Sequence, residues 1–206
     1  MHANRAFRWQ DEAAMLAFVG EVSFAHVFVE APDGPLVAHA PLVVTPEGNI
    51  RFHLASANAA APHLDGAVAL ASVAGPDAYV SPDWYESADQ VPTWNYLAVE
   101  IRGTVSRLPE SGLVAILDQL SAAHEGRLLP KRPWTRAKMR TGLFEGMLKA
   151  IIGFEMVVDD LRGTRKLGQN KKSADREGAA AGLEAAGQMK MAALMRAESG
   201  PAPAAE

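Results

Sequence analysis

The sequence contains no cysteine, which excludes disulfides, thiolate metal sites, iron–sulfur ligation and cysteine nucleophiles. It also lacks an apolar run of the length that a bilayer span requires, and no apolar stretch follows a basic start as in a secretory signal. The formal charge is −4 at pH 7, so the chain as a whole does not attract nucleic-acid phosphates. We therefore expect a cytoplasmic protein without a membrane segment.

Common catalytic signatures are missing as well. The chain has no G-x-S-x-G nucleophile elbow, no P-loop and no H-E-x-x-H run. Site chemistry must therefore come from histidine, carboxylate, basic and aromatic side chains. Since none of these is identifiable as a substrate acid or base, the sequence does not decide whether the protein is an enzyme.

Short β-type runs separated by turn residues dominate the chain. Asp33-Gly34 and the Thr45–Asn49 stretch supply hairpin turns, and Gly103 lies inside a long alternating run, as a bend in a closing barrel would require. Strands are expected over residues 23–30, 36–44, 50–55, 67–74, 95–107 and 151–161, and helices over 11–19, 109–124, 136–150 and 173–196. This order predicts a mainly β (α+β) fold with a closed or nearly closed antiparallel barrel.

The domain organisation is expected to be simple. We predict one barrel domain over residues 1–170, a helical segment over 171–198 that is rich in Ala, Glu and Met, and a disordered tail over 199–206.

Three histidines fall one on each of the first three expected strands. His26, His39 and His53 would lie near one another if these strands form a meander. Three readings stay open: a metal site, a ligand pocket, or structural side chains with hydrogen-bonded partners. The absence of a carboxylate at ligand spacing disfavours the metal, and we assign none.

The third expected strand ends in short hydrogen-bonding residues. Ser56 and Asn58 lie at this strand-to-turn junction, where backbone N–H groups can hold a phosphate or similar anion. The alternative is ordinary turn and helix-cap chemistry.

Aromatic residues are scarce, at 7% of the chain, yet residues 75–96 hold all three tyrosines and two of the four tryptophans. Prolines at positions 76, 82 and 92 predict that this segment forms loops rather than a continuous strand. Aromatic side chains on such loops suit a planar ligand or a subunit interface, or they cover one end of the barrel.

A basic run lies near the C-terminus. Residues 169–178 (QNKKSADREG) are typical of a solvated helix start, and contact with nucleic-acid phosphate is the alternative. No aromatic residues are interleaved with these charges, and no helix-turn-helix pattern accompanies them.

Several stretches together resemble the PaiB-type negative transcriptional regulators, which are grouped with the FMN-binding split-barrel proteins. The resemblance runs from about Phe7 to Leu183. Its most specific stretches are AHAPLVV (38–44), GPDAYVSPDWYE (75–86), VPTWNYLAVEIRG (91–103), KAIIGFEM (149–156) and KLGQNKKSADREG (166–178).

The resemblance implies a six-stranded antiparallel split β-barrel with flanking helices, and a homodimer that binds FMN at its interface. It implies that Asn58 and nearby N–H groups hold the phosphate, and that Tyr79 and Trp94 flank the ring. His53 and Gln169 would bond to the polar edge of the ring. The cofactor-binding residues expected in this way, together with the turn chemistry above, are His39, His53, Ser56, Asn58, Tyr79, Trp94, Lys166 and Gln169.

The sequence also departs from the family pattern. Where the family reads Arg-Ala-Asn-Pro, this chain reads Ser56-Ala57-Asn58-Ala59, so a bidentate phosphate partner is missing. A charge-assisted hydrogen bond contributes about 1.5–3 kcal/mol, and its loss weakens binding about tenfold to a hundredfold. Two alternatives follow: a DNA-binding repressor that has lost flavin binding, or a haem-binding split barrel with His26 or His63 as axial ligand.

Overall fold

The strands form one antiparallel sheet. The computed structural model describes residues 2–198, and the tail expected over 199–206 lies outside the described residues. The strands are β1 (Arg8–Trp9), β2 (Phe24–Val29), β3 (Leu36–Val44), β4 (Ile50–Ala55), β5 (Val68–Val80), β6 (Thr93–Arg107) and β7 (Ile151–Lys166).

Six of these strands close into a ring. The sheet order is β1-β7-β4-β3-β2-β5-β6, and β6 also pairs with β7. The two-residue β1 adds to β7 outside the ring. The antiparallel six-stranded barrel expected above is therefore present, with β1 as a small addition.

The chain divides into two compact units. The barrel unit comprises residues 12–73 and 100–161, and the terminal unit comprises the remaining described residues. Within the barrel unit, Val105 donates its N–H to the Ala67 carbonyl (2.8 Å) and accepts from the Gly66 N–H (2.9 Å), which joins the strand ends on that side.

The barrel core is aromatic and aliphatic. Phe52 of β4 stacks on Phe154 of β7 with 5.5 Å between ring centroids, and both side chains are buried. Gly103 of β6 is needed for closure, because a Cβ there would lie 2.0 Å from the Val157 carbonyl oxygen of β7. A residue with a side chain would force the two strands apart.

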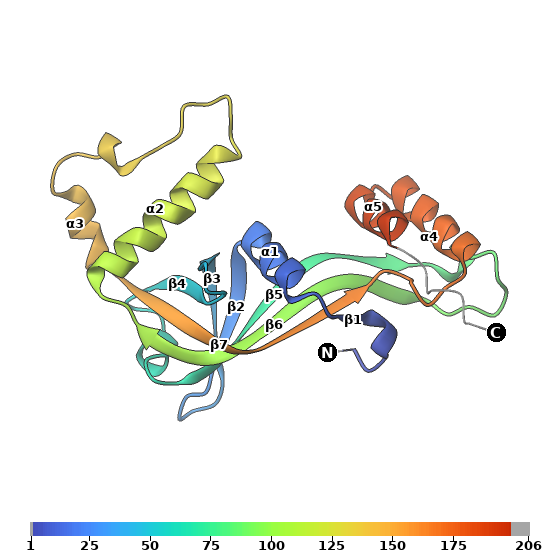
Figure 1. The fold of residues 1–206 in the computed structure, drawn as a ribbon, viewed down its shortest axis with the longest axis horizontal. Coiled ribbons are helices and arrows are strands. Elements are labelled where there is room, and N and C mark those ends of the chain that lie inside the picture. Colours follow the sequence, from blue (N-terminus) through green and yellow to red (C-terminus); the bar gives the residue numbers. More distant parts are fainter. Residues whose placement is uncertain (1, 199–206) are drawn as a thin grey trace. The chain divides into compact units, whose positions relative to one another are not determined.

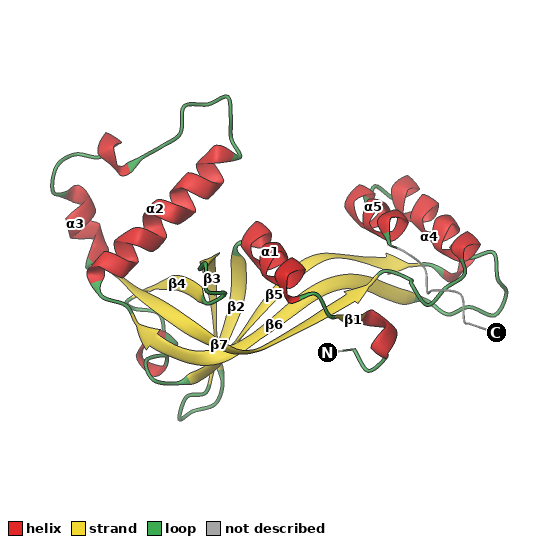
Figure 2. Ribbon diagram, in the orientation of Figure 1, coloured by secondary structure: helices red, strands yellow, loops and turns green. Residues whose placement is uncertain are grey.

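Helices flank the sheet (Figures 1 and 2). They are α1 (Glu12–Val22), α2 (Glu110–Gly126), α3 (Leu143–Leu148), α4 (Ser173–Ala185) and α5 (Met189–Ala197), with short 3-10 turns at η1 (Arg5–Phe7), η2 (Ala61–His63), η3 (Pro82–Trp84) and η4 (Arg136–Lys138). Within the part of the chain that the structure describes, no helix is both long and apolar enough to cross a membrane.

Two helix predictions need correction. The helix expected over 136–150 is reduced to η4 and α3, because Gly142 has a positive φ of 79° immediately before α3. The helix expected over 173–196 is two helices, α4 and α5, separated where Gly187 has a φ of 80°. In both places glycine adopts the left-handed conformation that ends a helix.

The prediction that residues 75–96 form loops is wrong for Tyr79 and Trp94, while the strand expected over 95–107 already included Tyr96. Strand β5 continues through Gly75 and Pro76, so Tyr79 lies on β5, while Trp94 and Tyr96 lie on β6. Proline is compatible with a strand where its missing N–H is not needed for a ladder hydrogen bond. The non-strand portion of the segment begins only after Val80.

The loop between β5 and β6 is anchored on α4. A Cβ at Gly182 would lie 2.3 Å from the indole of Trp84, and one at Gly178 would lie 2.3 Å from the Trp84 carbonyl oxygen. The Ser87 N–H and hydroxyl both donate to the buried Asp175 carboxylate at 2.8 Å. These bonds lower the pKa of Asp175. Trp84 is thus a structural anchor of the terminal unit.

Candidate functional site

The outer face of the barrel sheet is unusually apolar. On β2 the exposed or half-buried residues are Phe24, His26 and Phe28, which alternate with buried ones. Phe28 lies opposite Val37 of β3 and Leu70 of β5. The exposed fractions of Phe24 and Val37 are 46% and 47%. This face, which we call the outer sheet face, gathers several exposed apolar side chains around two histidines, and exposed apolar patches mark interaction sites.

Two histidines meet in the middle of the outer sheet face. His26 and His39 are directly opposite each other in the β2–β3 register. Their ring centroids are 4.8 Å apart in an edge-on arrangement. The meander predicted from the sequence therefore brings these two side chains together. In residues 2–198 no group of three or more His, Asp or Glu side chains could hold a metal ion.

His53 lies on the face of β4 that α2 covers. It is opposite Gly153 of β7, and a Cβ on Gly153 would lie 3.2 Å from Leu113 of α2. The Nδ1 atom of His53 is buried and has no hydrogen-bond partner among the described residues. Burial lowers the pKa of His53, so the neutral form of the ring is favoured at pH 7 while one buried nitrogen has no partner.

Ser56 borders a polar cavity of about 320 Å³. Arg107, at the end of β6, and Lys149, which follows α3, line the same cavity. Glu110 in the first turn of α2 also lines it. Two cations and a helix N-terminus favour an anion here, and Glu110 offsets part of that potential.

Asn58 uses its side chain within its own turn. The Asn58 Oδ1 accepts from the Ala60 N–H at 2.9 Å, and the Asn58 carbonyl accepts from the Ala61 N–H at 3.0 Å. The side chain thus fixes the turn after β4. His63, considered above as a haem ligand, lies in η2 directly after this turn.

Two exposed aromatic rings lie together in the terminal unit. Tyr79 and Trp94 pack edge-on with 6.3 Å between ring centroids. Their exposed fractions are 47% and 55%. A pair of large rings left this exposed is a natural surface for a planar molecule or a protein partner.

Another cavity, of about 240 Å³, lies in the terminal unit and has a mixed polar and apolar lining. Lys166 and Lys171 both line it, with Tyr85 and Thr93. Lys166 donates to the Thr93 hydroxyl, and the Lys171 ammonium lies 4.9 Å from the Tyr85 ring centroid. Burial, and to a lesser degree the charge of Lys171, lower the pKa of Lys166.

Gln169 folds back on the loop that follows β7. Its Oε1 accepts from the Leu167 N–H at 2.8 Å, and its Nε2 donates to the Arg165 carbonyl. Gly168 has a φ of 79°, so this turn requires glycine at that position. Gln169 shapes the loop that carries Lys171.

The sequence analysis missed two cationic contributors. Arg107 and Lys149 become visible only when distant segments come together around the cavity beside Ser56, whereas Lys171 lies in the basic run already singled out over residues 169–178. It also missed the strongest basic run, Arg127–Arg140 (RLLPKRPWTRAKMR), which contains Arg and Lys but no Asp or Glu. That signal was present in the sequence, and Trp134 interleaves it as nucleic-acid surfaces often do.

The donor set suits a flavin mononucleotide. Such a molecule needs cations for its phosphate, flat apolar surfaces for its ring system and hydrogen-bonding groups for its polar edge. The barrel unit offers the Arg107 and Lys149 cations beside Ser56, and the unpartnered Nδ1 of His53. The terminal unit offers the Tyr79–Trp94 rings and the Lys166 cavity. The barrel unit by itself therefore presents groups suited to a phosphate, and the terminal unit by itself presents flat surface suited to a ring.

Comparison with known proteins agrees with this chemistry. A family model with the description "Putative FMN-binding domain" matches residues 1–160. The Bacillus subtilis protein named protease synthase and sporulation protein PAI 2 is 31% identical over 179 residues, which cover 85% of this chain and 85% of that protein.

Solved structures share the fold. The FAD and haem binding protein from Mycobacterium smegmatis matches with a TM-score of 0.55 and 16% identity, covering 77% of this chain and 73% of that one. The flavocytochrome Anf3 from Azotobacter vinelandii matches with a TM-score of 0.57 and 16% identity, covering 80% and 72%. At such identities the likeness concerns the fold, and it confirms the split barrel.

Proposed function

The chain belongs to the PaiB-type family of FMN-binding split-barrel proteins, and from this membership we propose that it binds FMN and acts as a flavin-dependent redox or regulatory protein. The family match over residues 1–160 carries the proposal. Bound FMN would supply the electron-transfer chemistry, while the protein binds, orients and shields it.

The phosphate is proposed to bind in the cavity beside Ser56. Arg107 and Lys149 line that cavity, and they provide the positive charge that the family's missing arginine would otherwise give. The Ser56 hydroxyl is a further donor, and Asn58 holds the turn in shape. In this reading the cationic site is retained in the fold although the sequence motif has changed.

Groups for the ring system are proposed within each unit by itself. In the terminal unit, Tyr79 and Trp94 offer flat apolar surface, and Lys166 with the loop held by Gln169 offers donors. In the barrel unit, the free Nδ1 of His53 is a hydrogen-bonding partner for a polar edge.

A homodimer is proposed to form through the outer sheet face, with His39 at its centre. Phe24, Phe28, Val37 and Leu70 are exposed there. Exposed apolar side chains gathered on one face in this way are typical of an isologous dimer interface.

The test is purification followed by titration with FMN and with riboflavin, recorded by visible absorption and by quenching of flavin fluorescence. We expect saturable FMN binding and weaker riboflavin binding, since riboflavin lacks the phosphate. Absence of saturable binding of either flavin would overturn the proposal.

DNA binding is a second candidate function, favoured by the Arg127–Arg140 segment. This run is exposed, apart from the half-buried Met139. Some of its charge is engaged internally: Arg136 pairs with Asp118 at 3.2 Å, and Lys131 pairs with Glu125. The net positive charge of the run nevertheless gives a local basic patch on an acidic protein.

Gel-shift titration on duplex DNA at two salt concentrations tests this candidate. Replacing Arg132 and Arg140 with glutamine should weaken binding uniformly across sequences and lower the salt slope by about one per lost phosphate contact. Lys172→Gln, in the other basic run, is the matched control. Binding that is insensitive to the first pair but lost in the control would place the contact near α4 instead.

A further inference from the structure

The chain between α2 and β7 buries very little of itself. Over residues 127–150 the only buried side chain is that of Leu148. The segment therefore has no hydrophobic core of its own to offset the conformational entropy lost on ordering. Five of its apolar side chains nevertheless line one cavity against α2, within the barrel unit: Trp134, Met139, Phe144, Met147 and Leu148.

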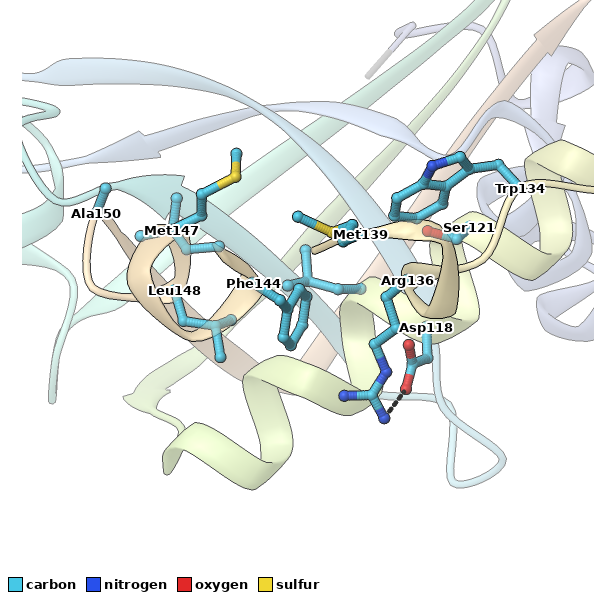
Figure 3. Close-up of a pocket in the computed structure, with 11 residues that line it drawn as sticks. Asp118, Ser121, Trp134, Arg136, Met139, Phe144, Met147, Leu148 and Ala150 are labelled. Carbon is cyan, nitrogen blue, oxygen red and sulfur yellow. Dashed lines mark ion pairs between the residues drawn. The ribbon is translucent and has the colours of Figure 1, made fainter. Parts of the chain in front are cut away.

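This cavity has a volume of about 390 Å³. Its apolar wall comes from α2, from the segment before α3, from α3 and from the start of β7; the principal contributors are Leu117, Trp134, Met139, Phe144, Met147 and Ile151. Figure 3 shows the Phe144 ring extending from α3 toward α2. The volume is at the small end of the range of about 300–1,000 Å³ found for ligand sites.

The cavity carries one fixed polar feature. Asp118 of α2 and Arg136 form an ion pair of 3.2 Å, drawn as the dashed line in Figure 3. The Arg136 guanidinium also lies 5.2 Å from the Phe144 ring centroid. Because the two charges compensate each other, the cavity does not select for a charged ligand. The guanidinium and the nearby Ser121 hydroxyl remain able to donate hydrogen bonds.

We propose that this cavity binds a small neutral aromatic molecule of one or two fused rings that carries a hydroxyl or carbonyl group. Two aromatic and two thioether side chains give a polarisable wall suited to a flat ring. Arg136 and Ser121 then receive the single polar group. None of the residues assigned to FMN lines this cavity, although it shares Leu148 and Ile151 with the cavity beside Ser56, and the proposal does not depend on flavin binding.

The occupant is a small molecule rather than a second copy of the chain. The cavity is bounded on several sides by α2, α3 and the intervening segment, which suits a compact ligand. A protein partner would instead need a long exposed face. Binding would also give the ordered segment, including part of the basic run, the buried apolar contacts it otherwise lacks.

Isothermal titration calorimetry of the full chain with 2-naphthol and with naphthalene tests the proposal. We expect saturable one-to-one binding, tighter for 2-naphthol because naphthalene lacks the polar group. Ser121→Phe places a ring inside the cavity and should weaken 2-naphthol binding at least tenfold. Ala122→Phe, on an exposed position of the same helix, is the control and should bind as the unmodified protein does.

A further variant separates the polar feature from the apolar wall. Arg136→Gln should reduce the preference for 2-naphthol over naphthalene while leaving naphthalene binding unchanged. Circular dichroism and thermal unfolding establish that each variant is folded, and sedimentation reports self-association. The proposal is overturned by absence of saturable binding, by equal binding to Ser121→Phe, or by a Ser121→Phe effect on self-association alone.

Discussion

The charge of the cavity beside Ser56 gives the sharpest prediction. Arg107 and Lys149 line this cavity together with Glu110. If the FMN phosphate binds there, Arg107→Gln removes a charge-assisted hydrogen bond worth about 1.5–3 kcal/mol. That corresponds to a loss of FMN affinity of about tenfold to a hundredfold.

The expected loss of FMN affinity is near the lower limit of this range. Arg107 and Lys149 are exposed, so solvent and salt screen their charges. We therefore expect about a tenfold loss for Arg107→Gln, a similar loss for Lys149→Gln, and a larger loss for the double variant. Glu110→Gln should act in the opposite direction and raise FMN affinity, because it removes a carboxylate that repels the phosphate.

Riboflavin provides the internal reference. Dissociation constants for FMN and riboflavin are measured by fluorescence quenching at one fixed ionic strength, and their ratio isolates the phosphate contribution. The matched control is Arg51→Gln, which removes a cation on β4 that pairs with Glu155 at 3.1 Å and does not line the cavity. An unchanged FMN-to-riboflavin ratio in the double variant would refute the phosphate assignment.

Three further predictions concern stability and assembly. Gly103→Ala should lower the free energy of unfolding in urea by at least about 3 kcal/mol, because the added Cβ meets the Val157 backbone oxygen. The control is Gly126→Ala, which has open space around it and should raise the free energy of unfolding by about 0.5–1 kcal/mol. Equal effects of the two substitutions would contradict the reasoning. Burial lowers the pKa of His53 below its ordinary 6.5, so the unfolded state binds a proton more readily than the folded state does. The resulting contribution to the free energy of unfolding is therefore fully present above pH 6.5 and decreases as the pH falls through the lowered pKa. His53→Gln should flatten that acid limb of the unfolding free energy, and an unaltered limb would count against it. Phe28→Asp on the outer sheet face should convert a dimer to a monomer in sedimentation velocity, whereas an unchanged sedimentation coefficient would exclude this face as the interface.

Much of the fold was predictable from local patterns. The alternation of β6, with Leu97, Val99 and Ile101 buried, and the turn residues between the early strands led directly to an antiparallel barrel. The errors arose where local rules compete with tertiary contacts. Pro76 predicted an interruption, yet β5 continues through it, because a strand tolerates proline where no ladder bond is lost.

The site was only partly predictable. The sequence placed His26 and His39 on neighbouring strands, and register then brought their rings to 4.8 Å. Arg107 and Lys149 are far apart in the chain and belong to no motif with Ser56, so local sequence analysis could not group them. For the aromatics of residues 75–96 the sequence left open a planar ligand, a subunit interface or a cover for the barrel end, whereas Gly178 and Gly182 of α4 show that Trp84 anchors a loop.

The amino-acid sequence by itself determined the barrel, its hairpin turns and the family, because strand alternation, turn chemistry and motif identity are local properties of the chain. Only the tertiary structure decided which charges share a cavity, which histidine nitrogen is left unpartnered, and how residues 134–151 form an apolar cavity with α2. Those features depend on contacts between segments distant in sequence, and such contacts are fixed by packing rather than by residue spacing.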